Sequence, residues 1–183
     1  IFATDSTLLG TFAMYYREPR GPDDHDRRLV EVATHAASIA IEHARSEEAL
    51  RASEERYRDL FENANEPIAT VTLDDTITEV NASFERVLGH TRAELVGSNI
   101  ADFLPPEGRD VPALQRDLKL SGEVTGTTYE QEFVTKDGSR VVFEVSSRLI
   151  EEDGRPIGVQ GVCRDITERR QTEKELRRLA AEN

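Results

Sequence analysis

The sequence predicts an α+β fold in which a five-stranded antiparallel sheet carries a helical cover, with a long connector helix before the sheet and an output helix after it. Three segments alternate apolar and polar side chains, as strands with one face on a core do: residues 129–136, 140–150 and 156–164. The connectors at 136–139 and 152–155 each contain Asp-Gly, a strong hairpin signal. Residues 24–63 contain neither Pro nor Gly, which favours one long helix.

The chain begins with a segment that we expect to be extended. Residues 7–17, TLLGTFAMYYR, are predicted to form a strand because β-branched and aromatic residues are frequent there. The following EPRGPDD contains two Pro and one Gly, which end the strand. A helix is then expected to begin near Asp23.

The long helix carries a regular apolar seam. Its positions keep a 3-4 spacing over more than four heptads: Leu29, Val32, Ala36, Ile39, His43, Ser46, Leu50, Ser53, Tyr57 and Leu60. Forty helical residues measure about 60 Å, too long for one small domain to cover. We therefore expect residues 24–63 to form a coiled coil in a parallel homodimer. Two shorter helices with a break near Arg45 are the alternative, because polar side chains weaken the middle of the seam.

The start of the sheet follows the long helix directly. Pro67 ends that helix, because the residue before a proline is pushed out of the helical region. Residues 68–73 and 76–80 are predicted strands around a tight turn at Asp74 and Asp75.

The helical cover is expected between the second and third strands. Asn81 is placed to cap ASFERVL, which Gly89 ends, and Thr91 with Glu94 can form a capping box for RAELVG. A short helical turn is predicted at 100–104 before two prolines, and a longer helix at 112–120. At the far end of the sheet, Asp165 is predicted to be an N-cap and Glu168 to close a capping box, so that the last strand passes into a helix with almost no linker.

Two sequence blocks carry a family resemblance. The blocks are NASFERVLGHTRAELVG and YEQEFVTKDGSRVVFEVSSRLIEEDGRPIGVQGVCRDITERR, the second ending in the Asp-Ile-Thr that joins the last strand to an outgoing helix. Over residues 54–170 the chain resembles a PAS domain. The resemblance implies a PAS domain at 64–166 and the start of an output helix at 167–183. Such domains sense a ligand, cofactor or partner and pass the state to an output domain, here a histidine kinase of a two-component system or a transcription regulator.

A second resemblance concerns the first 45 residues. LGTFAMYYREPRGP and the helix after it resemble the closing strand and last helix of a GAF domain. Residues 1–45 are therefore interpreted as the C-terminal remnant of such a domain, from which no activity is expected.

Charge and hydropathy limit the partners of the chain. The 36 acidic residues exceed the 23 basic ones, for a net charge of −13, and no basic face is evident, so we expect no nucleic-acid binding. Only three of the basic residues are Lys, which together with the acidity suggests a salt-rich, halophilic source; a GC-rich genome would explain the Arg bias alone. No apolar run is long enough for a membrane span, so we expect a cytoplasmic segment without membrane contact.

Strand phase and the resemblance together define a candidate pocket. Its expected lining is mostly apolar: Val71, Phe84, Leu88, Leu95, Ile100, Phe103, Leu114, Tyr129, Gln131, Phe133, Phe143, Val145, Ser147, Gly161 and Cys163. Such a lining suits an unidentified small organic ligand. The same side chains could instead fill the core, in which case the domain would act only as a dimerisation and interaction module.

No cofactor, metal site or catalytic activity is expected. A flavin-binding photosensor of this family has a reactive Cys on the helical cover, and a haem-binding member has an axial His on the long cover helix; residues 81–120 contain no Cys and 112–120 no His. His90 is expected to be structural, and Cys163, the only cysteine, to be a small buried core residue. No phosphate-binding loop, nucleophile elbow or zinc motif occurs, so any enzymatic activity would belong to an output domain.

The last expectation concerns signal relay at the exit of the sheet. The Asp165 carboxylate can accept hydrogen bonds from the start of the output helix and from Thr167. It is also expected to reach Lys136 or Arg140 at the neighbouring hairpin. The simpler alternative is that Asp165 only caps the helix.

Overall fold

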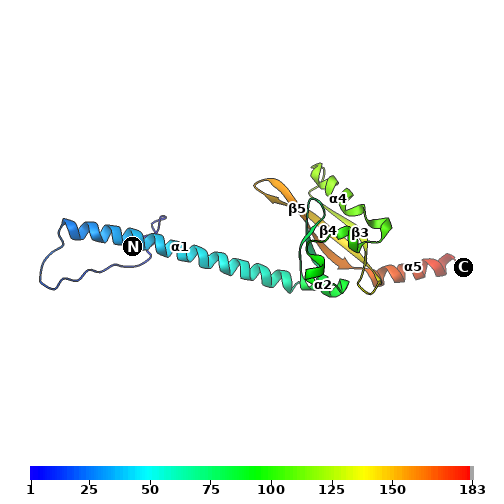
Figure 1. The fold of residues 1–183 in the computed structure, drawn as a ribbon, viewed down its shortest axis with the longest axis horizontal. Helices are drawn as coiled ribbons and strands as arrows, with labels where there is room; N and C mark the ends of the chain where they lie inside the picture. Colours follow the sequence, from blue (N-terminus) through cyan, green and yellow to red (C-terminus); the bar gives the residue numbers. More distant parts are fainter. Residues whose placement is uncertain (182–183) are drawn as a thin grey trace. The chain divides into compact units, whose positions relative to one another are not determined.

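The computed structural model describes residues 1–181, which divide into two compact units, residues 1–58 and the part from Asp59 onwards (Figure 1). Helix α1, Asp24–Glu62, is uninterrupted and supplies most of the first unit. The break considered near Arg45 is absent. Its continuity follows from forty residues without Pro or Gly.

The predicted strand at 7–17 is not formed. The N-terminal segment makes a single antiparallel bridge between Phe2 and Leu8, and residues 9–23 have no regular structure. A strand needs a partner edge to satisfy its backbone groups, and the described residues of this unit offer none. The segment is attached to α1 by side chains instead, since the Thr4 amide donates to Glu42 at 2.7 Å and Arg20 pairs with Asp26.

Unit two contains one antiparallel sheet with the order β2-β1-β5-β4-β3. The strands are β1 Ile68–Thr72, β2 Ile77–Val80, β3 Gly126–Val134, β4 Arg140–Glu152 and β5 Arg155–Asp165. The last strand lies at the centre, paired with β1 on one side and β4 on the other. The two hairpins turn at Gly138 and at Asp153-Gly154, which all have positive φ as Asp-Gly turns require.

The helical cover connects β2 to β3 and lies over one face of the sheet (Figure 1). It consists of α2 Ala82–Leu88, α3 Arg92–Leu95, α4 Val111–Leu120 and the 3₁₀ turns Ile100–Phe103 and Pro106–Gly108. The predicted caps are confirmed. Asn81 accepts the Phe84 amide at 3.0 Å, Gly89 ends α2 in the left-handed region, and the Thr91 amide donates to Glu94 at 2.9 Å.

The core lies between this cover and the inner face of the sheet. Phe133 of β3 makes edge-to-face contacts with Phe84 of α2 and Phe143 of β4, with ring centroids 6.0 and 5.3 Å apart. Alternating burial along β3 and β4 confirms the predicted strand phase, because Gln131, Phe133, Phe143 and their alternate neighbours are buried.

Helix α5, Thr167–Ala181, begins one residue after β5. The prediction of Asp165 as N-cap is wrong by one position: Asp165 is the last residue of β5, and its carboxylate accepts the Thr167 amide at 2.8 Å. Hydrogen bonding within the strand extends one residue further than the alternation indicated. Residues 182 and 183 of the expected output helix lie outside the described residues. None of the helices within residues 1–181 is both long and apolar enough to cross a membrane.

Candidate ligand-binding cavity

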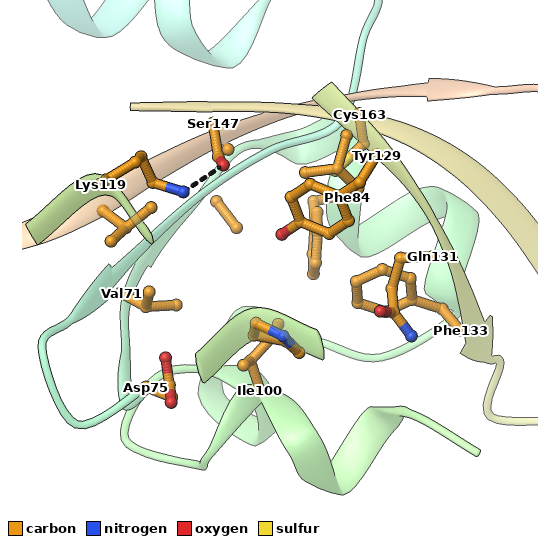
Figure 2. A pocket seen from close by; sticks show the side chains of 15 residues that line it. Val71, Asp75, Phe84, Ile100, Lys119, Tyr129, Gln131, Phe133, Ser147 and Cys163 are labelled. Atoms are coloured by element: carbon orange, nitrogen blue, oxygen red, sulfur yellow. Dashed lines mark hydrogen bonds between the residues drawn. The ribbon is translucent and has the colours of Figure 1, made fainter. Parts of the chain in front are cut away.

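A cavity of about 60 Å³ lies between the inner face of the sheet and the helical cover. Figure 2 shows the side chains around it. The walls are Ala69, Val71, Asp75, Phe84, Ile100, Pro112, Lys119, Tyr129, Gln131, Phe133, Val145, Ser147, Val159, Gly161 and Cys163. All five segments that define the fold contribute: the β1 hairpin, the cover, β3, β4 and β5.

Most of the predicted lining residues surround this cavity. Val71, Phe84, Ile100, Tyr129, Gln131, Phe133, Val145, Ser147, Gly161 and Cys163 are all in its walls. Four others are buried in the core beside the cavity rather than in its wall: Leu88, Leu95, Phe103 and Phe143.

Leu114 was wrongly predicted to line the pocket, because its side chain is 64% exposed. Helix α4 turns Pro112 and Lys119, seven residues apart, toward the cavity. At about 100° per residue, Leu114 is displaced by roughly 200° from Pro112 and therefore points away. The sequence had suggested the apolar residue as the inward one, whereas the structure buries the lysine.

Lys119 is the main functional candidate that sequence reasoning missed. Only 2% of the residue is exposed, and its ammonium donates to the Gln115 carbonyl, Thr127 Oγ1 and Ser147 Oγ at 2.7, 3.0 and 3.0 Å. Among the described residues no carboxylate lies within 4.0 Å of it. Burial, and secondly the charge of Arg116, lower the pKa of Lys119. No sequence signal marks this lysine, since lysines are rarely buried.

Three hydroxyl groups of the sheet belong to this site: two accept hydrogen bonds from the ammonium, and a third points into the cavity. Ser147 Oγ and Thr127 Oγ1 are 3.2 Å apart and join β4 to β3 beside Lys119. The Tyr129 hydroxyl points into the cavity (Figure 2), and burial, with a smaller contribution from Cys163, raises the pKa of Tyr129 to about 12. Tyr129 is therefore a hydrogen-bond donor throughout the physiological range.

Asp75 and Arg116 form an ion pair at the edge of the cavity. Arg116 of α4 donates to Asp75 in the turn after β1, and both side chains are about 15% exposed. Asp75 has a φ of +66°, a left-handed backbone conformation that Asp adopts more readily than most residues in tight turns. The pair ties α4 to the β1–β2 hairpin and neutralises the one carboxylate that residues 1–181 place in the cavity wall.

Gln131 is buried with one unsatisfied atom. The residue is 4% exposed, its Nε2 donates to the Glu132 carbonyl at 3.0 Å, and its Oε1 has no partner among the described residues. Gly108 lies so close that an added Cβ would be 2.5 Å from Nε2, so the amide is confined on that side. A buried acceptor without a donor costs about 1–3 kcal/mol, which makes Gln131 Oε1 an attractive contact for a ligand.

The cavity does not fit a flavin or a haem. Pockets for ligands of drug size measure roughly 300–1,000 Å³, against about 60 Å³ here. The wall contains no His, and its one thiol, Cys163, lies on β5 rather than on the cover; burial raises the pKa of Cys163 to about 12. His90 is outside the wall, with its ring against Phe103 at 5.1 Å.

The proposed relay residues are only partly brought together. The Val142 amide donates to Thr167 Oγ1 and the Ile166 amide to the Val142 carbonyl, both at 2.9 Å, so β4 holds the junction before α5. The expected contacts of Asp165 with the hairpin are wrong. Lys136 instead pairs with Glu94, and Arg140 pairs with Glu107 and Glu132, because acidic side chains of the cover and of β3 lie nearer.

The family model described as PAS fold matches residues 61–171, more than half of the chain. The chain belongs to the PAS family. The solved PAS domain of an HTR-like protein from Haloarcula marismortui is 28% identical, with a TM-score of 0.58 over 67% of this chain and 99% of that one. The PAS fold thus coincides with the sheet and cover that enclose the cavity.

Two curated relatives are signalling sensors. The chain is 31% identical over 175 residues to the methyl sulfide methyltransferase-associated sensor of Methanosarcina acetivorans, which covers 94% of this chain and 17% of that protein. It is 27% identical over 137 residues to the sensor histidine kinase TmoS of Ectopseudomonas mendocina, covering 73% of this chain and 14% of that protein. The PAS domain and its flanking helices therefore span less than a fifth of these sensors.

Proposed function

We propose that this chain is the sensory and relay segment of a signal-transduction protein, in which the PAS domain binds a small ligand and passes its state through α5 to an output domain. One observation carries the proposal. Strand β5 supplies Val159, Gly161 and Cys163 to the cavity wall and, one residue after its end, continues as α5. A ligand that displaces β5 therefore acts directly on the start of α5.

The input side is connected to the same domain. Asn81 Nδ2 donates to the carbonyls of Phe61 and Glu66, and its Oδ1 accepts the Ile68 and Phe84 amides. The last turn of α1, β1 and α2 thus share one buried side chain. By analogy with the sensor histidine kinase among its relatives, the output would be a histidine kinase of a two-component system. From the sequence resemblances alone we further propose that the chain acts in the cytoplasm downstream of a GAF domain and is not itself an enzyme.

A second candidate function, a dimerisation and interaction module, is favoured by α1. All ten positions of its predicted seam are exposed, including Val32, Ile39 and Leu50, each more than half exposed. An exposed apolar seam with heptad spacing is typical of a helix that pairs with a second copy. We infer a parallel homodimer, in which both α5 helices leave at the same end; this module and the sensor can coexist in one protein.

The relay through β5 can be tested with a pair of variants. Cys163→Val adds bulk at the cavity wall, and we expect it to change hydrogen exchange of the first turn of α5. Asp165→Ala removes the carboxylate that accepts the Thr167 amide. A hydrogen bond of this kind contributes about 1 kcal/mol, so first-turn amides should exchange about fivefold faster while the PAS core stays folded. In the Asp165→Ala background the response of α5 to Cys163→Val should be lost.

Asp137→Ala is the matched control, because Asp137 accepts the Ser139 amide in a hairpin turn that is not connected to α5. It should leave the response of α5 unchanged. If α5 does not respond to Cys163→Val, the relay through β5 is refuted. An equal response with and without the Asp165 carboxylate would mean that this residue only stabilises the junction between β5 and α5.

A further inference from the structure

We propose that the cavity binds a short hydroxycarboxylate, with its carboxylate against the Lys119 ammonium and its hydroxyl donating to Gln131 Oε1. This inference rests on the proposed sensory function and names the ligand class of the same site. Lys119 and Gln131 both lie in the wall of one small cavity, and Figure 2 shows them on either side of Tyr129.

The first half of the inference concerns the charge of Lys119. An ammonium that is 2% exposed is costly to bury and is normally paired with a carboxylate. Here its three acceptors are neutral, and the carboxylate in the wall, Asp75, is occupied by Arg116. The wall therefore carries one positive charge without a counter-charge, which an anionic ligand would neutralise.

The hydroxyls around Lys119 allow an anion to enter. A serine or threonine hydroxyl can both accept and donate a hydrogen bond. Ser147 and Thr127, which now accept hydrogen bonds from Lys119, can therefore rotate and donate to a carboxylate. The Lys119 N–H groups that had donated to these hydroxyls can then donate to the ligand carboxylate instead. Because Ser147 is on β4 and Thr127 on β3, binding would be felt directly by the sheet.

The second half concerns Gln131. Its Oε1 is buried and has no donor among the described residues, so a ligand hydroxyl at this end would satisfy it. A second carboxylate would instead face this acceptor and be repelled. An amino acid would bring another ammonium into a cavity that already holds one, so dicarboxylates and amino acids are both disfavoured.

Size limits the rest of the ligand. A volume of about 60 Å³ exceeds the roughly 10–15 Å³ that one water needs but is far below that of an aromatic cofactor. The remaining walls are apolar, with Val71, Ile100 and Val145 available to contact a methyl group. Lactate and glycolate have the required carboxylate, hydroxyl and size.

Titration calorimetry of the whole chain with sodium lactate and sodium glycolate, against sodium chloride of equal ionic strength, tests the inference. We expect saturable binding with one site per chain. Propionate lacks the hydroxyl and should bind about tenfold more weakly, as an unsatisfied buried acceptor predicts, and alanine and malonate should bind more weakly still. Absence of saturable binding, or equal affinity for lactate and propionate, would overturn it.

Two variants test the named contacts. Lys119→Met should abolish lactate binding while keeping the fold, because Met has a similar volume and the Ser147 and Thr127 hydroxyls keep the hydrogen bond to each other. Lys174→Met, the same change on the exposed face of α5, should bind lactate as the wild type does. Gln131→Leu should make the affinities for lactate and propionate nearly equal. Wild-type binding by Lys119→Met, or a retained lactate preference in Gln131→Leu, would refute the contact concerned and with it the proposal.

The binding and hydrogen-exchange experiments together distinguish a wrong ligand class from a wrong relay through β5. If lactate and glycolate fail to bind but α5 still responds to Cys163→Val through Asp165, only the ligand class is wrong. If lactate binds through Lys119 but hydrogen exchange of α5 does not change, the site is right and the proposed relay is wrong.

Discussion

Burial changes the acid–base properties of three side chains in the cavity wall. It raises the pKa values of Tyr129 and Cys163 to about 12 and lowers that of Lys119. Each of these shifts moves the equilibrium toward the neutral form, because the low-polarity interior disfavours charge. At the residue scale, the cavity wall thus disfavours an uncompensated charge, and an anionic partner would stabilise the Lys119 ammonium.

Cys163 offers a test of this behaviour. Its folded pKa lies above the ordinary value of 9.0, so its contribution to stability is fully present below pH 9 and is lost as the pH rises toward 12. By pH 11 the thiol should cost the wild type about 2–3 kcal/mol relative to pH 8. Urea unfolding of Cys163→Ala should show a loss smaller by that amount. Lys119 acts in the opposite direction, so only the difference between the two proteins is diagnostic, and parallel pH profiles would contradict the assignment.

At the element scale, α1 has two different faces. Val30, Ala33, Ala37 and Ile41 are partly covered within the first unit, whereas the seam positions are exposed. A single helix packed only against its own N-terminal segment would not need a second apolar stripe. The seam therefore supports the proposed pairing with another copy of α1, which its heptad spacing favours.

Substitutions along the seam test this pairing. Ile39→Asp together with Leu50→Asp places charges at two seam positions and should convert a dimer into monomers in light scattering of the whole chain. Ala44→Asp together with Ala52→Asp is the matched control, because both alanines are exposed on α1 outside the seam. A dimer that survives the seam variant would place the association surface elsewhere, for example on the outer face of the sheet.

At the scale of the whole molecule, the excess of acidic residues determines the long-range electrostatics. The net charge is −13, and the ion pairs that tie the surface together are mostly exposed Arg–Glu pairs such as Arg51–Glu55 and Arg140–Glu107. Such pairs contribute only about 0–1 kcal/mol each. Self-repulsion of the excess acids is therefore the larger long-range effect, and salt should relieve it.

We expect the melting temperature to rise by several degrees between 0.1 and 1 M KCl, across which the screening length falls from about 10 to 3 Å. Differential scanning calorimetry measures this directly. A variant with Glu31, Glu54 and Glu123 each changed to Gln removes three exposed acids that form no ion pair with the described residues, and it should gain less stability from salt. A flat or falling melting temperature would contradict the idea of a protein suited to high salt.

Much of the PAS fold was predictable because its signals are local. Asn81 and Gly89 set the two ends of α2 through hydrogen bonds to residues a few positions away. The Asp-Gly pairs form both hairpin turns because their glycines adopt positive φ. Period-two alternation placed Gln131, Phe133 and Phe143 on the inner face without knowledge of the partner strands. Each of these features depends on backbone geometry that a short segment determines alone.

Tertiary structure alone decided the features that distinguish this cavity. The burial of Lys119 rather than Leu114 depends on the rotation of α4 over the sheet, and the neutralisation of Asp75 on Arg116, 41 residues away. The absent strand at 7–17 and the partners of Lys136 and Arg140 also depend on which groups lie opposite in space. The sequence by itself determined the strands of the sheet, the caps of α2 and α3 and the faces that β3 and β4 bury. Which charge is left without a partner was decided only by packing, because a charge is compensated by groups that are distant along the chain.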